Sequence, residues 1–265
     1  MEFQAASFFW DPSPQIIEGL PVRWYGLLFA VGFIVAYQVL LNIFKKENVS
    51  VKVLESLTFY MIIATVVGAR LGHCLFYEPE TYLADPISIL YVWEGGLASH
   101  GAAVGILAAM GIFLWRNRDI SFYWLADRLS IVIAFVAGCV RVGNFVNSEI
   151  LGSPADLPWS IIFSKVDLIP RHPAQLYEAI TYFILFTLLL VLYKKIDTNK
   201  FKGLLSGIFL IIMFTARFLI EFVKDVQVDF EHSLTLHLGQ FYSIPFVLLG
   251  IYLIYYALKN AKKLN

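Results

Sequence analysis

The sequence predicts an all-α polytopic membrane protein with seven transmembrane helices, and three observations carry this prediction. Hydrophobic residues fill 59% of the 265 positions. Charged residues fill only 15%, whereas a soluble domain usually carries about a quarter. Several stretches are mostly apolar over about 20 residues, the length that a helix needs to cross the hydrocarbon core. None of them alternates apolar and polar residues as a barrel strand does.

Seven such spans follow one another along the chain. They cover residues 24–44, 54–76, 97–115, 120–140, 174–193, 203–223 and 238–258. The first span is expected to remain in the protein, because Glu2 and Asp11 precede any basic residue and no cleavage site follows a short apolar stretch. No linker, low-complexity tract or internal repeat divides residues 1–265, which are interpreted as one integral-membrane domain. The two cysteines, Cys74 and Cys139, are interpreted as packing residues rather than as a disulfide or metal site.

The distribution of lysine and arginine predicts the orientation of the spans. Twelve of the 20 basic residues lie after spans one, three and five or in the C-terminal tail: Lys45, Lys46, Lys52, Arg116, Arg118, Lys194, Lys195, Lys200, Lys202, Lys259, Lys262 and Lys263. Cytoplasmic loops carry such an excess of basic residues, so the N-terminus is expected in the periplasm and the C-terminus in the cytoplasm. Residues 145–173 are expected to form a small irregular periplasmic head with room for one hairpin, and residues 77–94 a periplasmic arm.

Every predicted span carries a polar residue near its outer end. These residues are Arg23, Tyr25, Arg70, His73, His100, Arg141, Asn144, Gln175, Glu178, Arg217, Glu221 and Gln240. A single interfacial arginine most often only extends toward the headgroups. Ionisable groups in a hydrocarbon core are costly and usually mark function or pair with one another, so their convergence at one depth predicts a polar cavity open to the outer leaflet. Several arginines in such a cavity favour a phosphate ligand.

Two pairs of charged residues are close enough in sequence to interact within one helix. Arg217 and Glu221 are four residues apart, so they are expected to share a helix face, with Glu221 holding the guanidinium. Asp127 and Arg128, near the inner end of span four, are expected to form a local ion pair or to extend toward the inner headgroups. The first pair belongs to the predicted cavity, and the second is interpreted as structural.

Glycine-containing segments add further detail. The ranges Gly68–Gly72 and Gly101–Gly105 have the GxxxG spacing that lets helices approach closely, although this pattern is common in membrane bundles. The stretch Arg141–Gly152 is more distinctive. It combines charges, amides and glycines at the membrane surface, where backbone donors can approach an anion.

The stretch Arg141–Gly152 resembles the signature of the bacterial phosphatidylglycerol–prolipoprotein diacylglyceryl transferases, approximately G-R-x-G-N-F-x-N-x-E-x-x-G. Further similar segments follow in the family's order along nearly the whole chain: Val22–Gly26, Gly68–Gly72, Trp93–Gly96, His100–Gly101, Arg171–Glu178, Arg217 with Glu221, and Gly239–Gln240. Two positions depart from the pattern. Val140 stands where glycine is common, and Met213 stands where some members carry a tyrosine. The matched segments are specific to the family when taken together.

This resemblance implies an activity and a set of site residues. Members transfer the diacylglyceryl group of phosphatidylglycerol to the lipobox cysteine of a prolipoprotein signal peptide, in the bacterial inner membrane and without a cofactor or metal. The implied catalytic residues are His100, Arg141 and Arg217, and the implied substrate-binding residues are Tyr25, Arg70, Asn144, Glu149, Gly152 and Glu221. Arg141 and Arg217 are expected to bind the leaving phosphate near the periplasmic leaflet, and His100 is a candidate base for the substrate thiol.

Other classes of function fit the pattern less well. A transporter or receptor for a small anionic solute could also bury arginines among seven spans, but the sequence lacks the inverted repeats and midplane helix breaks typical of transporters. Metal-dependent phospholipid transferases require clustered aspartates, which the sequence lacks. The formal net charge of zero argues against nucleic acid as a partner.

Overall fold

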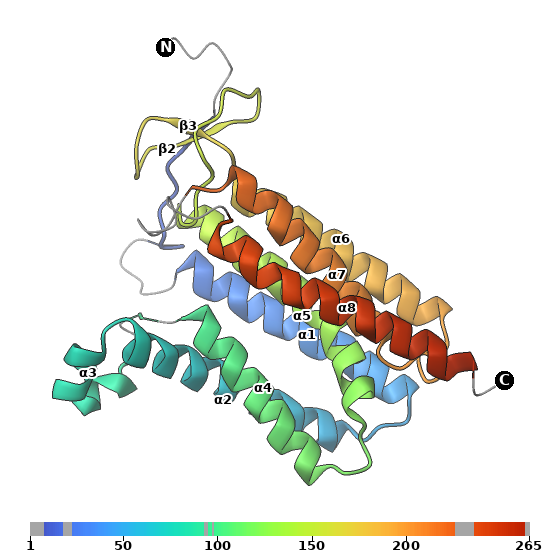
Figure 1. Cartoon of the computed structure of the whole chain (residues 1–265). Helices are drawn as coiled ribbons and strands as arrows, with labels where there is room; N and C mark the ends of the chain where they lie inside the picture. The colour runs from blue at the N-terminus through green and yellow to red at the C-terminus, as the bar shows by residue number, and fades with distance from the viewer. Residues whose placement is uncertain (1–7, 18–22, 93–94, 97, 226–235, 263–265) are drawn as a thin grey trace. The chain divides into compact units, whose positions relative to one another are not determined.

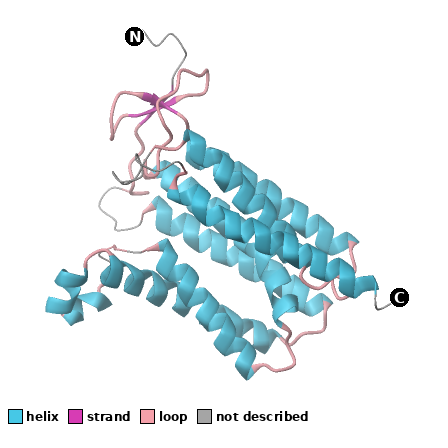
Figure 2. Cartoon of the chain, viewed as in Figure 1, coloured by secondary structure: helices cyan, strands magenta, loops and turns pink. Residues whose placement is uncertain are grey.

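Helices make up most of the computed structural model, which describes residues 8–17, 23–92, 95–96, 98–225 and 236–262 (Figures 1 and 2). Within these residues, six helical segments are long and apolar enough to cross a membrane: α1 (Trp24–Lys46), α2 (Val51–Phe76), α5 (Phe122–Val146), α6 (Ala174–Lys195), α7 with its extension (Leu204–Val223) and α8 (Leu238–Lys262). A shorter apolar helix, α4 (Ser99–Arg116), occupies the remaining expected span. The prediction of a mostly helical, multi-pass membrane protein is confirmed.

The end of α5 differs from the sequence-based expectation. The sequence predicts that span four ends at residue 140, but the helix continues to Val146, so Arg141 and Asn144 lie within its last two turns. The chain leaves the helix where Ser148 and Ile150 adopt left-handed φ angles of 57° and 56°. In a similar way, α7 (Leu204–Ile220) continues as the 3-10 turn η3 (Glu221–Val223).

Residues 40–122 form one of two compact units. In this unit α2 and α4 cross at glycines whose backbones touch, since a Cβ atom added to Gly101 would lie 2.2 Å from the carbonyl oxygen of Gly68. The close helix approach that the GxxxG spacing predicts is therefore confirmed. The expected arm at residues 77–94 includes the short helices α3 (Pro79–Ala84) and η1 (Pro86–Leu90).

Residues 1–39 and 123–265 form the other unit, in which α5, α6, α7 and α8 run side by side (Figure 1). α5 meets α6 through Phe135 and Phe183, whose ring centroids are 5.4 Å apart. Gly207 of α7 lies against Gly250 of α8, where an added Cβ atom would come within 2.9 Å of a carbonyl oxygen. The helices of this unit are thus held by aromatic contacts and by a second close glycine crossing.

Two charged residues near one end of α5, Asp127 and Arg128, are buried. Asp127 accepts hydrogen bonds from Gly203 N, Ser206 N and Ser206 Oγ, each 2.8 Å long, and so stabilises the start of α7. Arg128 donates to Thr198 Oγ1 at 2.9 Å. Asp127 and Arg128 are both 0% exposed, so neither extends to the headgroups.

A three-stranded sheet lies at the end of this unit where α5 ends and α6 begins (Figure 1). Its strands are β1 (Phe8–Trp10), β2 (Ile161–Phe163) and β3 (Pro170–Arg171), with β1 parallel and β3 antiparallel to the central β2. Phe145, Ile161 and Phe163 form a small core against which Trp10 packs. The hairpin expected in the head is found as β2 and β3, whereas the third strand, which a segment near the N-terminus supplies, was not predicted.

Candidate active site

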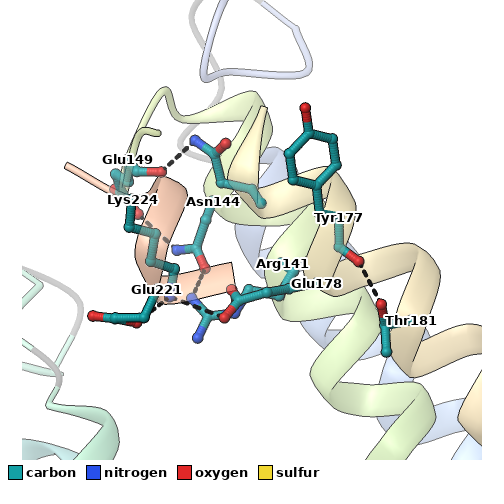
Figure 3. Close-up of polar contacts among 9 residues, drawn as sticks. Arg141, Asn144, Glu149, Tyr177, Glu178, Thr181, Glu221 and Lys224 are labelled. Carbon is teal, nitrogen blue, oxygen red and sulfur yellow. Dashed lines mark hydrogen bonds and ion pairs between the residues drawn. The ribbon is translucent and has the colours of Figure 1, made fainter. Parts of the chain in front are cut away.

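The last turns of α5 begin a line of polar contacts (Figure 3). Arg141 Nη1 donates to Asn144 Oδ1 at 3.2 Å, and Asn144 Nδ2 donates in turn to Glu149 Oε2 at 3.0 Å. Arg141 and Asn144 are three residues apart, so the helix places them on one face. Gln175 Nε2 donates to the carbonyl oxygen of Glu149 at 2.6 Å and anchors that residue to α6. The structure thus brings together three residues of the predicted site.

Two further charged residues, Glu178 of α6 and Lys224, join this group (Figure 3). Glu178 is one of the polar residues of the predicted cavity, but neither residue is among the implied catalytic or substrate-binding residues. Glu178 is 0% exposed; its Oε2 lies 2.7 Å from Arg141 Nε, and its Oε1 accepts a hydrogen bond from Lys224 Nζ at 2.9 Å. The Oε2 atom makes no aligned hydrogen bond, so its contact with Arg141 is an ion pair. In the sequence, Glu178 is recognisable as an acidic residue in an apolar span, whereas Lys224 resembles an ordinary loop lysine.

The expected pairing of Glu221 with Arg217 is wrong. Glu221 lies 3.3 Å from Lys224 Nζ. Within the described part of the chain, Arg217 makes no hydrogen bond or ion pair. Arg217 nevertheless lies near this cluster. The Tyr182 hydroxyl interacts electrostatically with Arg217 and also with Glu178 and Arg141. Among the described residues, the guanidinium of Arg217 therefore has no carboxylate partner.

Tyr25, in the first turn of α1, packs against α5. A Cβ atom added to Gly143 would lie 2.8 Å from Tyr25 Cδ2, so the glycine makes room for the ring. The phenol lies within electrostatic range of Glu149 and Arg141. The structure therefore places Tyr25 beside the polar contacts of Arg141, as the sequence predicts for a site residue.

Gly152 connects the head to the chain segment that carries Lys224. A Cβ atom at Gly152 would lie 2.3 Å from the carbonyl oxygen of His172, so only glycine fits without displacing the backbone. Gly152 and Lys224 form an antiparallel bridge, flanked by hydrogen bonds from Ser153 N to Val223 O (2.9 Å) and from Asp225 N to Leu151 O (3.0 Å). Gly152 thus positions the backbone of Lys224 instead of contributing a polar atom of its own to the cluster.

A second charged group stabilises the same part of the head. Arg171 Nη2 lies 2.6 Å from Asp167 Oδ2, and Arg171 Nη1 lies 2.7 Å from Asp225 Oδ2. The hydrogen bonds from Arg171 hold the pKa of Asp167 below its ordinary value, and Asp167 in turn raises the pKa of Arg171. Burial lowers the pKa of His172, whose Nδ1 is 3.2 Å from the Tyr177 hydroxyl. These residues stabilise the head around Gly152.

Two residues of the predicted set, Arg70 and His100, belong to the unit of residues 40–122. Arg70 is 2% exposed and donates to the carbonyl oxygens of Ser88 (2.6 Å), Ile89 (2.9 Å) and Gly95 (2.6 Å). It therefore holds the arm. His100 is exposed in the first turn of α4 and makes no hydrogen bond or ion pair within the residues that the structure describes.

Some expectations fall outside what the structure describes. Val22, Trp93 and Glu94, which belong to the segments that resemble the family, lie outside the described residues. Among the residues inside that set, no three His, Cys, Asp or Glu side chains are placed to hold a metal ion. The candidate site therefore consists of arginine, lysine, carboxylate, amide and phenol groups.

Comparison with known proteins gives one consistent result. The family model for "Prolipoprotein diacylglyceryl transferase" matches residues 14–256. A phosphatidylglycerol–prolipoprotein diacylglyceryl transferase of Chloroherpeton thalassium is 46% identical over 256 residues, which cover 96% of both chains. One from Tolumonas auensis is 47% identical over 254 residues (95% of this chain and 98% of the relative), and one from Bacteroides fragilis is 39% identical over 261 residues (93% and 94%). The chain therefore belongs to the prolipoprotein diacylglyceryl transferase family and is a multi-pass membrane enzyme.

Proposed function

We propose that the chain transfers the diacylglyceryl group of phosphatidylglycerol to the thiol of the lipobox cysteine in a prolipoprotein signal peptide, and that the polar cluster around Arg141 binds the leaving phosphate. The substrate sulfur forms a bond to the glycerol methylene carbon while that carbon's bond to the phosphate oxygen breaks. Glycerol phosphate leaves with the bonding electrons, and the thiol proton passes to a base. No cofactor is needed for this exchange.

The arrangement of Arg141 carries the proposal. The departing phosphate gains negative charge, and donors placed where charge develops lower the barrier. Arg141 is held by Asn144 and Glu178, yet its side chain remains 13% exposed. Arg217 supplies a second guanidinium that has no ion pair within the described residues. Planar guanidinium groups suit phosphate because they donate two parallel hydrogen bonds.

The remaining residues of the cluster shape the headgroup site. Asn144 and Glu149 orient Arg141 toward the headgroup, and Tyr25 supplies a hydroxyl for headgroup or ester oxygens. Gly152 positions the backbone of Lys224 through the antiparallel bridge, and Glu221 holds the Lys224 side chain through an ion pair. Arg70, whose side chain holds the arm, contributes to substrate binding through that arm.

The substrate thiol needs activation. A cysteine thiol has a pKa of about 8.5, so most of it is protonated near neutrality, and only the thiolate attacks efficiently. We assign His100 as the base that accepts this proton. Its exposed imidazole, which makes no hydrogen bond within the described residues, supports the assignment.

We further propose that the chain is one functional domain in the bacterial inner membrane, with α4 as the seventh span. The twelve basic residues that follow spans one, three and five or lie in the tail support a periplasmic N-terminus and a cytoplasmic C-terminus. This orientation directs the ends of α5 and α6 that carry Arg141 and Glu178 toward the periplasmic leaflet.

Glycerol phosphate release from phosphatidylglycerol, measured with a synthetic lipobox peptide, tests these roles. Arg141→Lys should lower the rate by roughly 100- to 1000-fold at most, with partial activity left because the ammonium keeps the charge but not the paired donors. His100→Gln should lower the rate by about 100-fold or more at neutral pH. Arg118→Lys, at an exposed loop position, is the matched control and should be fully active.

The pH profile separates the two roles. Raising the pH increases the thiolate fraction of the substrate, so His100→Gln should regain activity between neutral and mildly alkaline conditions, whereas Arg141→Lys should not. A His100→Gln defect that stays constant over this range would remove His100 from the role of base. Full activity of Arg141→Lys would refute phosphate binding by Arg141.

A further inference from the structure

A buried carboxylate, Glu178, contacts the proposed phosphate-binding arginine, Arg141 (Figure 3). The side chain of Glu178 is 0% exposed, whereas that of Arg141 is 13% exposed. A substrate can therefore reach the arginine but not the carboxylate. A buried anion is costly unless cations compensate it. Glu178 accordingly has a cation at each oxygen, Arg141 at Oε2 and Lys224 at Oε1.

The contacts of Arg141 determine how its guanidinium lies. Glu178 takes the Nε side at 2.7 Å, and Asn144 accepts from Nη1 at 3.2 Å. The group carries five N–H donors in one plane, so these two contacts restrict its orientation and leave N–H groups for a phosphate. We propose that Glu178 is a positioning residue that directs the guanidinium of Arg141 at the leaving phosphate, a role that rests on the proposed phosphate binding by Arg141.

Lys224, the second cation beside Glu178, depends less on this carboxylate than Arg141 does. Lys224 is held by two carboxylates, Glu178 at 2.9 Å and Glu221 at 3.3 Å. If Glu178 loses its charge, Lys224 keeps an ionic partner. Arg141 has no other ion pair among the described residues, so it loses its only one. The functional consequence of neutralising Glu178 therefore falls on Arg141.

A double-mutant cycle on the full-length enzyme tests this dependence. Glu178→Gln keeps the size of the side chain but removes the charge that holds Arg141 Nε. A misplacement of about 1 Å can cost up to about 100-fold in rate, so kcat should fall toward that limit while the KM for the lipobox peptide stays unchanged. Arg141→Lys has no planar guanidinium to be oriented, so adding Glu178→Gln should cause little further loss.

Asp127→Asn is the matched control. Asp127 is another carboxylate that is 0% exposed in the same unit, but it stabilises the start of α7. Its substitution should change activity by the same factor with and without Arg141→Lys. If the loss of activity in the Glu178→Gln/Arg141→Lys double variant equals the product of the two single losses, Glu178 acts independently of Arg141. That result overturns the positioning role.

The outcomes distinguish this role from the proposed function. A fully active Arg141→Lys refutes phosphate binding by Arg141. An impaired Arg141→Lys, together with an independent loss from Glu178→Gln, refutes only the positioning role. If Glu178→Gln does not fold, Glu178→Asp replaces it, because aspartate keeps the charge but withdraws the carboxylate by one methylene. The same coupling to Arg141→Lys is expected for that variant, and full multiplication of the losses again overturns the proposal.

Discussion

The crossing of α2 and α4 allows a stability prediction whose size follows from the structure. In Gly101→Ala, the new Cβ atom would lie 2.2 Å from Gly68 O, 2.7 Å from Gly72 Cα and 3.0 Å from Gly72 N. All three are backbone atoms, so no flexible side chain can move aside. Carbon contacts normally lie at about 3.5–4.0 Å, so the helices must separate by roughly 1 Å. Overpacking of this kind costs about 1–3 kcal/mol.

Gly111→Ala in the same helix is the matched control. No atom lies within 4 Å of a Cβ added at Gly111, so this variant reports only the helix propensity of alanine, a gain of up to about 1 kcal/mol. Both variants share that gain, and the difference between them isolates the cost of overpacking. Thermal unfolding in detergent should give Gly101→Ala the lower melting temperature. Equal melting temperatures would refute the inference that these backbones touch.

Three further predictions concern orientation, lipid choice and pH. In a cysteine-free background, a cysteine at Asp156 should react with a membrane-impermeant thiol reagent on intact cells and one at Lys200 should not; the reverse result would invert the proposed orientation. Phosphatidylglycerol should be turned over faster than phosphatidylethanolamine in the same detergent, because a site rich in arginine favours a net anionic headgroup; equal rates would contradict the phosphate-binding account. Arg171 depresses the pKa of Asp167 in the folded state, so the pair's stabilisation is complete above about pH 4 and is lost as the pH falls through the depressed pKa. Asp167→Asn should therefore weaken the acid dependence of head stability, and an unchanged stability–pH profile would show that the pair contributes nothing.

The helices could be predicted from the sequence because membrane spans are governed by length and hydropathy. Each predicted span coincides with a helix, and the largest discrepancy at a helix end is at α5, which runs on to Val146. The head could not be predicted in the same way. The pairing of Phe8 with Ile161 joins residues that are far apart in the sequence through strands of two or three residues, which leave no periodic signal.

The site could be predicted only in part, for a different physical reason. The spacing of Arg141 and Asn144 indicates a shared face, and a direct contact is found. Spacing alone does not reveal which neighbouring helix presents a partner, so Glu178 and Lys224 could not be assigned to Arg141. Arg70 illustrates the converse problem: its position suggested a ligand-binding arginine, but the carbonyl groups of the arm take up its donors.

The contacts at the two ends of α5 also constrain how this enzyme can vary in evolution. Asp127 holds the start of α7, and Arg141, fourteen positions later, holds Asn144 and Glu178. Fourteen residues span about 21 Å and nearly four helical turns, so both side chains leave the helix on nearly the same side. One inserted residue between them would turn Arg141 by about 100° relative to Asp127. The number of residues between Asp127 and Arg141 therefore fixes both their distance along α5 and the angle between their side chains. Insertions or deletions in this stretch should be absent from active relatives, although loops tolerate them.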